Sequence, residues 1–299
     1  MIDLTYLSFL FLQILNGLIM GLIYALMAVG VTLIFGVMKV VNFAHGEFYM
    51  LGGYVLYFAA MSLGGFSIPG IAFAFVATFV VGAIFELGIL RPMFTQKMER
   101  PLEYSVIATF GLSIFLMNFA LVVFGHHFKK PPDFLEGSVA ISILNIGAGR
   151  IVGALVGVLT LLITLVLIKR TWLGRALQAT SQNREAAAIL GISVLNMNTL
   201  AFALGAGLAG VAGGILAPLF YCYSNVGELP GIKAYVITVL GGLGSIKGSL
   251  IGGVILGVVE SLGSIFLSTA YRDVYSFAVL MAVLILRPTG LFGEKERRV

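Results

Sequence analysis

The sequence predicts an all-α protein, a polytopic transmembrane helical bundle with eight or nine crossings, some of them broken or re-entrant. Two observations predict this class. Of the 299 residues, 60% are hydrophobic and only 10% are charged, whereas about 25% of a soluble domain is charged. The mean hydropathy is +1.07. No polar stretch is long enough to fold separately, so residues 1–299 are expected to form a single membrane domain.

The apolar residues fall into segments of the length that a spanning helix needs, roughly 20 residues. These segments lie at about 10–37, 43–62, 68–90, 104–125, 151–168, 197–220, 232–246, 249–268 and 274–287. Segments 43–62 and 232–246 are short or broken by glycine, so half-helices or re-entrant pieces are expected there. The first segment lacks the basic flank and cleavage site of a signal peptide, which predicts a permanent span.

The basic residues predict the orientation, because short loops rich in Lys and Arg stay on the cytoplasmic side. Three connections qualify: 91–103, 169–196 and the C-terminal tail. Their basic residues are Arg91, Lys97, Arg100, Lys169, Arg170, Arg175, Arg184, Lys295, Arg297 and Arg298. The N-terminus has no Lys or Arg before Lys39 and is expected outside. Lys129 and Lys130 lie in the connection between two of these cytoplasmic loops. Because successive connections alternate sides of the membrane, this one is expected outside, although the positive-inside rule disfavours lysine there.

Glycine recurs at four-residue spacing along several segments. The repeats are Gly17/Gly21, Gly210/Gly214, Gly244/Gly248/Gly252 and Gly253/Gly257. In lipid, small residues at this spacing let helix backbones approach closely. The pattern therefore predicts tight helix packing, and by itself it says nothing about function.

The longest polar segment is 169–196, KRTWLGRALQATSQNREAAAILGISVLN. Its composition favours helix. Two interpretations are open: a solvated connecting helix, or a cytoplasmic helix that docks into a groove of a partner protein.

The stretch 241–257, GGLGSIKGSLIGGVILG, superficially resembles a phosphate loop. The required spacing is G-x-x-x-x-G-K-[ST], but here Lys247 follows Ile246. The match fails, so a turn or broken helix is expected and no nucleotide site is found.

The single cysteine, Cys222, excludes a disulfide and a multi-cysteine metal site. The net charge of +5 sits in loops and tail and indicates topology, not nucleic-acid binding. No cofactor or metal is expected.

Three carboxylates lie within apolar segments: Glu47, Glu86 and Glu260. Charged groups inside a span are costly and usually face protein or water. Glu86, five residues before Arg91, is interpreted as interfacial. Glu260 lies in mid-segment and is either a buried packing partner or a residue of a transport pathway.

The stretch 41–55, VNFAHGEFYMLGGYV, concentrates polar groups in an apolar setting. If it is one helix, Asn42, His45 and Tyr49 share a face and Glu47 points elsewhere. One histidine makes no metal site, and two groups make no proton relay. The remaining alternatives are a structural polar cluster at a helix break and a place on a substrate pathway.

Four long stretches carry a family resemblance. They are 16–55, NGLIMGLIYALMAVGVTLIFGVMKVVNFAHGEFYMLGGYV; 170–192, RTWLGRALQATSQNREAAAILGI; 239–261, VLGGLGSIKGSLIGGVILGVVES; and 270–293, AYRDVYSFAVLMAVLILRPTGLFG. In order and spacing they resemble the Liv-type (LivH-like) permeases, the membrane subunits of ABC importers for branched-chain amino acids. The chain is closer to the H-type than to the M-type subunit. One departure is Lys247, where the family usually has proline.

The resemblance implies a permease in the inner membrane that works with a second, related permease, two cytoplasmic ATPases and an extracytoplasmic substrate-binding protein. The cargo would be an amino acid. Glu185-Ala186-Ala187 and Gly191 resemble the EAA-x-x-x-G core through which such permeases contact their ATPases. The implied coupling residues are Gly174, Arg175, Arg184, Glu185, Ala186, Ala187 and Gly191. The candidate pathway residues are Asn42, His45, Glu47, Tyr49, Gly52, Gly53, Gly241, Gly242, Gly244 and Glu260.

Three other functions compete with this interpretation. Similar permeases carry urea or short amides. An autonomous secondary transporter or channel would need sites for a coupling ion, for which only His45, Glu47, Glu86 and Glu260 are available. An intramembrane enzyme would need a nucleophile–base pair or a carboxylate cluster, and the sequence shows neither. No catalytic residue is therefore expected.

Overall fold

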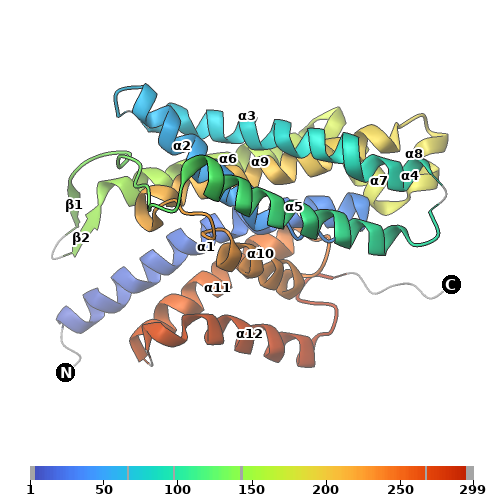
Figure 1. Ribbon diagram of the computed structural model, residues 1–299. Coiled ribbons are helices and arrows are strands. Elements are labelled where there is room, and N and C mark those ends of the chain that lie inside the picture. The colour runs from blue at the N-terminus through green and yellow to red at the C-terminus, as the bar shows by residue number, and fades with distance from the viewer. Residues whose placement is uncertain (1–3, 66, 97, 142–143, 267, 294–299) are drawn as a thin grey trace.

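The computed structural model describes residues 4–65, 67–96, 98–141, 144–266 and 268–293. Nearly all of them are helical, as the sequence predicts, and long helices run side by side (Figure 1). The helices are α1 (Leu4–Met38), α2 (His45–Ser62), α3 (Ile68–Phe85), α4 (Arg91–Thr95), α5 (Pro101–Phe124), α6 (Ala148–Arg170), α7 (Trp172–Gln182), α8 (Arg184–Ile189), α9 (Val194–Phe220), α10 (Glu228–Gly241), α11 (Ile246–Phe266) and α12 (Arg272–Leu286). A π-helical turn, η1 (Glu86–Leu90), joins α3 to α4, and a 3-10 turn, η2 (Thr269–Tyr271), precedes α12.

Six described helices are long and apolar enough to cross a membrane. They span Phe9–Met38, Ile68–Thr95, Pro101–Phe124, Ala148–Arg170, Val194–Phe220 and Ile246–Phe266. The other three expected segments are also helices, but α2, α10 and α12 have only 18, 14 and 15 residues. The structure therefore confirms a multi-pass helical bundle, and the count of eight or nine crossings is not confirmed.

The two ends of the bundle differ (Figure 1). At one end lie the start of α1, the α2–α3 connection and an antiparallel hairpin of β1 (Ser138–Ile141) and β2 (Leu144–Gly147), with Ser138 opposite Gly147. At the other end lie α4, α7 and α8. We call them the hairpin end and the basic end, because Arg91, Arg170 and Arg175 are on or beside the elements at the latter. Lys97 and the basic residues of the tail lie outside the described residues.

Helices α1 and α9 form the core. Helix α1 packs against α9, α10 and α11, while α9 packs against α1, α2 and α3. Nearly every residue of α9 from Ala201 to Pro218 is buried. Large apolar side chains of α3, α5 and α6 face outward, among them Val76, Ile107 and Leu155. An outer ring of exposed apolar side chains is what a lipid environment requires.

The predicted glycine packing is clearest where α1 crosses α11. Gly17 and Gly21 of α1 lie on Gly257 and Gly253 of α11. A Cβ atom at Gly21 would come within 2.7 Å of the Gly253 carbonyl oxygen. The backbones touch here, so the four-residue spacing serves close helix approach.

Two short helices start inside the bundle, as expected for segments 43–62 and 232–246. The first turn of α2 touches the first turn of α10, because a Cβ atom on either Gly46 or Gly227 would overlap the backbone of the other. From this contact α10 runs to Gly241, while α2 runs to Ser62, next to the α2–α3 connection at the hairpin end.

Lys129 and Lys130, the two residues that break the charge rule, have local partners. The Lys129 ammonium lies 5.4 Å from the ring centre of Tyr57 and 5.8 Å from that of Phe58. Its backbone exchanges two hydrogen bonds with Cys222, of 3.0 and 2.8 Å. Lys130 is 4.0 Å from Asp133. The lysines thus serve local packing at the hairpin end.

Replacing Gly21 with valine should destabilise the fold by about 1–3 kcal/mol or more, because the added side chain overlaps the backbone of α11. The midpoint of thermal unfolding in detergent measures this. The matched control is Gly111→Val on α5, where an added Cβ meets no atom within 4 Å. Equal midpoints for the two variants would contradict the close crossing of α1 and α11.

Candidate functional site

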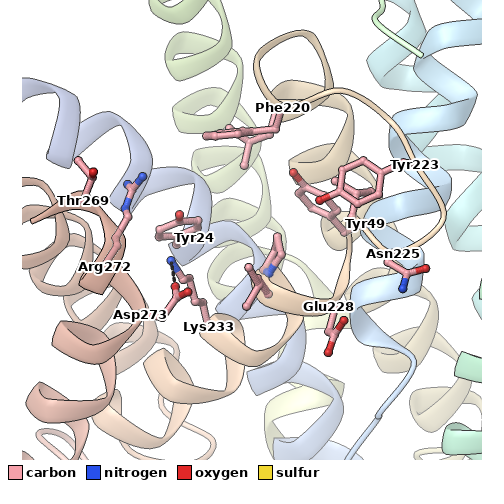
Figure 2. Close-up of a pocket in the computed structure, with 14 residues that line it drawn as sticks. Tyr24, Tyr49, Phe220, Tyr223, Asn225, Glu228, Lys233, Thr269, Arg272 and Asp273 are labelled. Carbon is pink, nitrogen blue, oxygen red and sulfur yellow. Dashed lines mark ion pairs between the residues drawn. The ribbon is translucent and has the colours of Figure 1, made fainter. Parts of the chain in front are cut away.

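A cavity of about 430 Å³ opens in the bundle where the first turns of α10 and α12 meet the end of α9. Its walls come from α1, α2, α9, the 221–227 loop, α10, η2 and α12. Figure 2 shows Lys233, Asp273 and Arg272 gathered near Tyr24, with Phe220, Tyr49 and Tyr223 across the cavity from them. The cavity therefore has a charged side and an aromatic side. Its volume lies in the range of roughly 300–1,000 Å³ that small-molecule sites occupy.

The charged side is a network of two cations and two carboxylates. The Lys233 ammonium is 2.9 Å from Glu260 and 3.0 Å from Asp273. The Arg272 guanidinium donates to the other oxygen of Glu260 at 2.8 Å. Ser276 also donates to Glu260. The four charges balance, which is the condition for keeping them inside an apolar bundle.

The two carboxylates of this network differ in exposure. The Glu260 side chain is fully buried, whereas the Asp273 side chain is 45% exposed. The Lys233 side chain is 10% exposed, and its ammonium lies 5.4 Å from the ring centre of Tyr24. Glu260 is thus the fixed anchor of the network, and Asp273 is its solvent-facing member.

Glu260 is a buried partner of Lys233 and Arg272, two residues that line the cavity. Its place on a transport pathway stays a prediction. No motif in the sequence marks Lys233, Arg272, Asp273 or Tyr24 as residues of a site. Lys233 carried a usable signal, since it is a cation inside an apolar segment that needs a carboxylate partner. Tyr24 gives no such sequence signal, because one tyrosine in an apolar span does not require a charged partner.

The stretch 41–55 is not one helix. Helix α2 begins at His45, so Asn42 precedes it, and the predicted shared face of Asn42, His45 and Tyr49 is wrong. The Asn42 side chain accepts the Ala44 N–H at 3.1 Å, and its carbonyl accepts the Tyr235 hydroxyl at 2.5 Å. The chain breaks here because these local bonds replace those of a helix.

The polar side chains of this stretch are used for packing. The His45 ring nitrogen Nε2 lies 3.1 Å from the Met27 carbonyl oxygen, and the ring is fully buried. Glu47 points away toward α5, as expected, and accepts the Ser113 hydroxyl at 2.8 Å. Of the candidate pathway residues in this stretch, only Tyr49 lines the cavity.

The two candidate glycines of α2, Gly52 and Gly53, lie where α2 closely approaches its neighbours. Gly52 lies against the backbone of Gly210 on α9, and Gly53 faces the Cys222 sulfur, 3.1 Å from where a Cβ would stand. Cys222 itself is buried. These contacts hold α2 on the core and place Tyr49, three residues before Gly52, at the cavity.

Gly241, Gly242 and Gly244 lie at the other end of α10 from the cavity. They form the expected turn between α10 and α11, with φ of +101° at Gly242 and +87° at Gly244, a backbone region that favours glycine. The Gly241 carbonyl accepts the Phe292 N–H at 3.0 Å. The turn thus ties the C-terminal segment to the bundle. Lys247 lies in the first turn of α11.

Glu86, which is interpreted as interfacial, lies within the protein. Glu86 is fully buried where α3 passes into the π-helical turn η1, and it accepts the Thr199 hydroxyl at 2.5 Å. Its burial follows from the packing of this turn on α9. Its role is structural.

The polar segment forms two helices, α7 and α8, at the basic end (Figure 1). Asn183 caps α8 by accepting the Ala186 N–H at 3.0 Å. The exposed candidates are Arg175, Glu185, Ala186 and Gly191, whereas Gly174 and Ala187 are buried. Arg184 is turned inward: it donates to Asn198 at 2.9 Å, and its guanidinium lies 4.7 Å from the ring centre of Phe94.

Two large apolar side chains stand out at the tip of α8. Ile189 is 86% exposed and Leu190 is 79% exposed. They lie on a polar segment and not on the outer face of a long apolar helix, so lipid does not explain them.

Comparison with known proteins gives one family. Residues 13–284 match the family described as "Branched-chain amino acid transport system / permease component". This chain belongs to that family. The match includes every helix that lines the cavity and also α7 and α8. The family is one of transport permeases, and with its six long apolar helices this chain is a multi-pass protein of the inner membrane.

Individual relatives agree over nearly their full length. The chain is 36% identical to the high-affinity branched-chain amino acid transport system permease protein LivH of Escherichia coli (strain K12), over 95% of this chain and 96% of the relative. Identity to BraD of Pseudomonas aeruginosa is also 36%, with the same coverage. The probable LivH of Methanocaldococcus jannaschii is 29% identical, over 96% and 94%. No solved structure matches the chain significantly.

No group of three or more His, Cys, Asp or Glu residues that could hold a metal is present among the described residues. The charged side chains that line the cavity are Glu228, Lys233, Arg272 and Asp273.

Replacing Glu260 with glutamine should destabilise the permease by about 3–5 kcal/mol, because Lys233 and Arg272 lose the buried charge that they share. Asp273→Asn is the matched comparison and should destabilise less, because Asp273 is 45% exposed and Lys233 keeps Glu260 as a partner. Thermal unfolding midpoints of the purified variants measure both effects. A midpoint for Asp273→Asn as low as that for Glu260→Gln would refute the assignment of Glu260 as the anchor.

Proposed function

We propose that this chain is the permease subunit of an ABC importer that carries branched-chain amino acids (leucine, isoleucine, valine) or similar amino acids into the cytoplasm. One observation carries the proposal: identity of 36% over 95% of the chain to relatives named as permeases of high-affinity branched-chain amino acid transport systems. Separate ATPase subunits would supply the energy. The failed phosphate-loop match at Lys247 agrees with this division.

The basic end is the cytoplasmic end in this proposal, and the hairpin end faces outward. The positive-inside rule supports this, because Arg91, Arg170 and Arg175 lie on or beside elements at one end. The chain then crosses nine times: six full helices, α12, and two passages that each combine extended chain with the half-helices α2 and α10. The N-terminus is outside and the tail inside.

Helices α7 and α8 are the proposed contact with the ATPases. The support is the exposed apolar tip of α8, with Ile189 and Leu190 beside the exposed Glu185 and Gly191. An apolar pair on a polar helix suits a groove in a partner protein. Arg184, Gly174 and Ala187 act differently: they hold α7 and α8 on the bundle, so that a push on the tip moves the bundle.

The full importer would contain a second, related permease, two cytoplasmic ATPases and an extracytoplasmic substrate-binding protein. The cavity beside Lys233 opens between elements whose ends lie toward the hairpin end, where such a binding protein would deliver its cargo.

The substitution Glu185→Arg or Ile189→Asp should weaken association with the ATPases at least about tenfold, the effect of losing one well-packed contact at an interface. Co-purification of the ATPases with the permease pair from membranes measures it. The matched control is Glu99→Arg, the same charge change at an exposed site of the same end. Normal ATPase recovery and full uptake in both variants would overturn the coupling assignment.

The cargo is tested on the cognate binding protein, because that component sets most of the selectivity of such an importer. Titration calorimetry should show tight binding of leucine, isoleucine or valine and no binding of urea or acetamide. Binding of urea with no response to the three amino acids would replace the proposed cargo by a small amide.

A further inference from the structure

The Lys233–Asp273 ion pair is the one link of the charged network that faces the cavity. Glu260 is fully buried and is held by Lys233, Arg272 and Ser276, so its bonds cannot be exchanged without leaving a buried charge unpaired. Asp273 is 45% exposed and is 3.0 Å from Lys233. Water can solvate the Asp273 carboxylate when it leaves Lys233, whereas Lys233, only 10% exposed, keeps its bond to Glu260. A ligand can therefore displace Asp273 from Lys233 far more easily than it can displace Glu260.

Lys233 is suited to hold a second carboxylate. Its ammonium carries three donors, and two of them reach carboxylates, Glu260 at 2.9 Å and Asp273 at 3.0 Å. Its position beside the Tyr24 ring and Glu260 keeps it in place if Asp273 moves. Figure 2 shows Lys233 and Asp273 joined by their ion pair below Tyr24, away from Tyr49 and Tyr223.

We infer that the cavity is a transit site for a zwitterionic α-amino acid, which inserts into the Lys233–Asp273 pair, binding its carboxylate to Lys233 and its ammonium to Asp273. This inference rests on the proposed import of amino acids. An α-amino acid carries its two charged groups on one carbon, so they fit between a lysine and an aspartate that are already neighbours. The number of charges in the network stays balanced before, during and after binding.

The opposite side of the cavity suits the rest of such a ligand. Figure 2 shows Phe220, Tyr49 and Tyr223 there, and the lining of the cavity also includes the apolar Leu216 and Val226. Asn225 and Glu228 are polar residues of the same lining. An apolar or branched side chain placed here leaves water and packs on apolar and aromatic surface. The site thus combines a charged pair that orients the ligand with a wall that accepts an aliphatic group.

Insertion into an existing ion pair also keeps binding weak. The ligand replaces one ion pair by two, but it must first be freed of water and must separate Asp273 from Lys233. A transport route requires weak binding, because a substrate must both enter a site and leave it. A neutral amide such as urea has no charged groups with which to divide the pair.

The test uses the complete importer in proteoliposomes, with leucine and the leucine-loaded binding protein. Asp273→Asn should lower leucine uptake at least about tenfold, because the ligand ammonium loses a charged partner. ATP hydrolysis stimulated by the loaded binding protein should stay near the wild-type rate, because docking and coupling use other surfaces. The matched control is Asp133→Asn. Asp133 is also 45% exposed and also paired with a lysine, but it lies outside the cavity.

A second variant tests the cavity without changing a charge. Leu229 lines it and is largely exposed, so Leu229→Trp narrows the space with little risk to the fold. It too should lower uptake while stimulated hydrolysis continues. If the Asp273→Asn permease fails to assemble into the importer, leucine uptake by the Leu229→Trp variant tests whether leucine passes through the cavity.

Three results would overturn the inference. Wild-type uptake in the variants would show that leucine does not pass this site. A parallel loss of uptake, stimulated hydrolysis and thermal stability would show that Asp273 has a structural role only. Failure of the wild-type importer to carry leucine, isoleucine or valine while it carries urea would reject the proposed function, and the inference with it. The first two results leave the proposed function standing.

Discussion

The contact between the first turns of α2 and α10 is the constraint on which the rest of the site depends. A helix that starts inside an apolar bundle leaves its first N–H groups and the chain before it without water. Here protein groups supply partners: Asn42 accepts the Ala44 N–H, and Tyr235 donates to the Asn42 carbonyl. Only glycine at positions 46 and 227 lets the two backbones meet. Because α10 begins at this depth, Lys233 comes to lie beside Glu260 and the cavity opens in front of it.

Charge balance is the second constraint, and it follows from the first. A lysine carried into the bundle by a half-helix needs a carboxylate, and Glu260 of α11 provides it. Glu260 in turn holds Arg272 of α12, so one buried carboxylate joins three helices. In this arrangement Asp273 is the second carboxylate partner of Lys233, and its side chain is partly exposed to water. The charge balance that the bundle requires therefore produces an ion pair, Lys233–Asp273, whose partners a ligand can replace.

Much of this fold is predictable from the sequence, because long apolar segments and glycine spacing report local physics. All nine apolar segments are helices, and the two that look broken do begin inside the bundle. The helix break in 41–55 agrees with one of the two interpretations of this stretch. The shared face of Asn42, His45 and Tyr49 was wrong, because local side-chain bonds that stop a helix leave no periodic signal. The burial of Glu86 cannot be read from its distance to Arg91, because it depends on how η1 packs on α9.

The site was less predictable than the fold. Glu47 and His45 interrupt an apolar run, yet neither lines the cavity, and each makes one hydrogen bond to a neighbouring helix. The cavity is built by residues from α1, α9, α10 and α12, which are far apart in the sequence. No spacing rule brings Tyr24, Lys233 and Asp273 together, since only the packing of α1 on α10 and of α10 on α12 does so. Lys233 could have been found by asking which buried cation Glu260 requires.

The same packing gives the proposed coupling a physical route. Helix α7 contacts α1, α6 and α9, and α8 contacts α9. Helices α1 and α9 contribute Tyr24 and Phe220 to opposite sides of the cavity, as Figure 2 shows. Their backbones touch at Gly30 and Gly205, where a Cβ on Gly30 would come within 2.8 Å of the Gly205 carbonyl oxygen. Close-packed helices of this kind transmit displacement as rigid bodies, because no soft side-chain layer lies between them. A push on the tip of α8 would therefore reach both sides of the cavity, and a change in its width is what would drive a weakly held zwitterion onward.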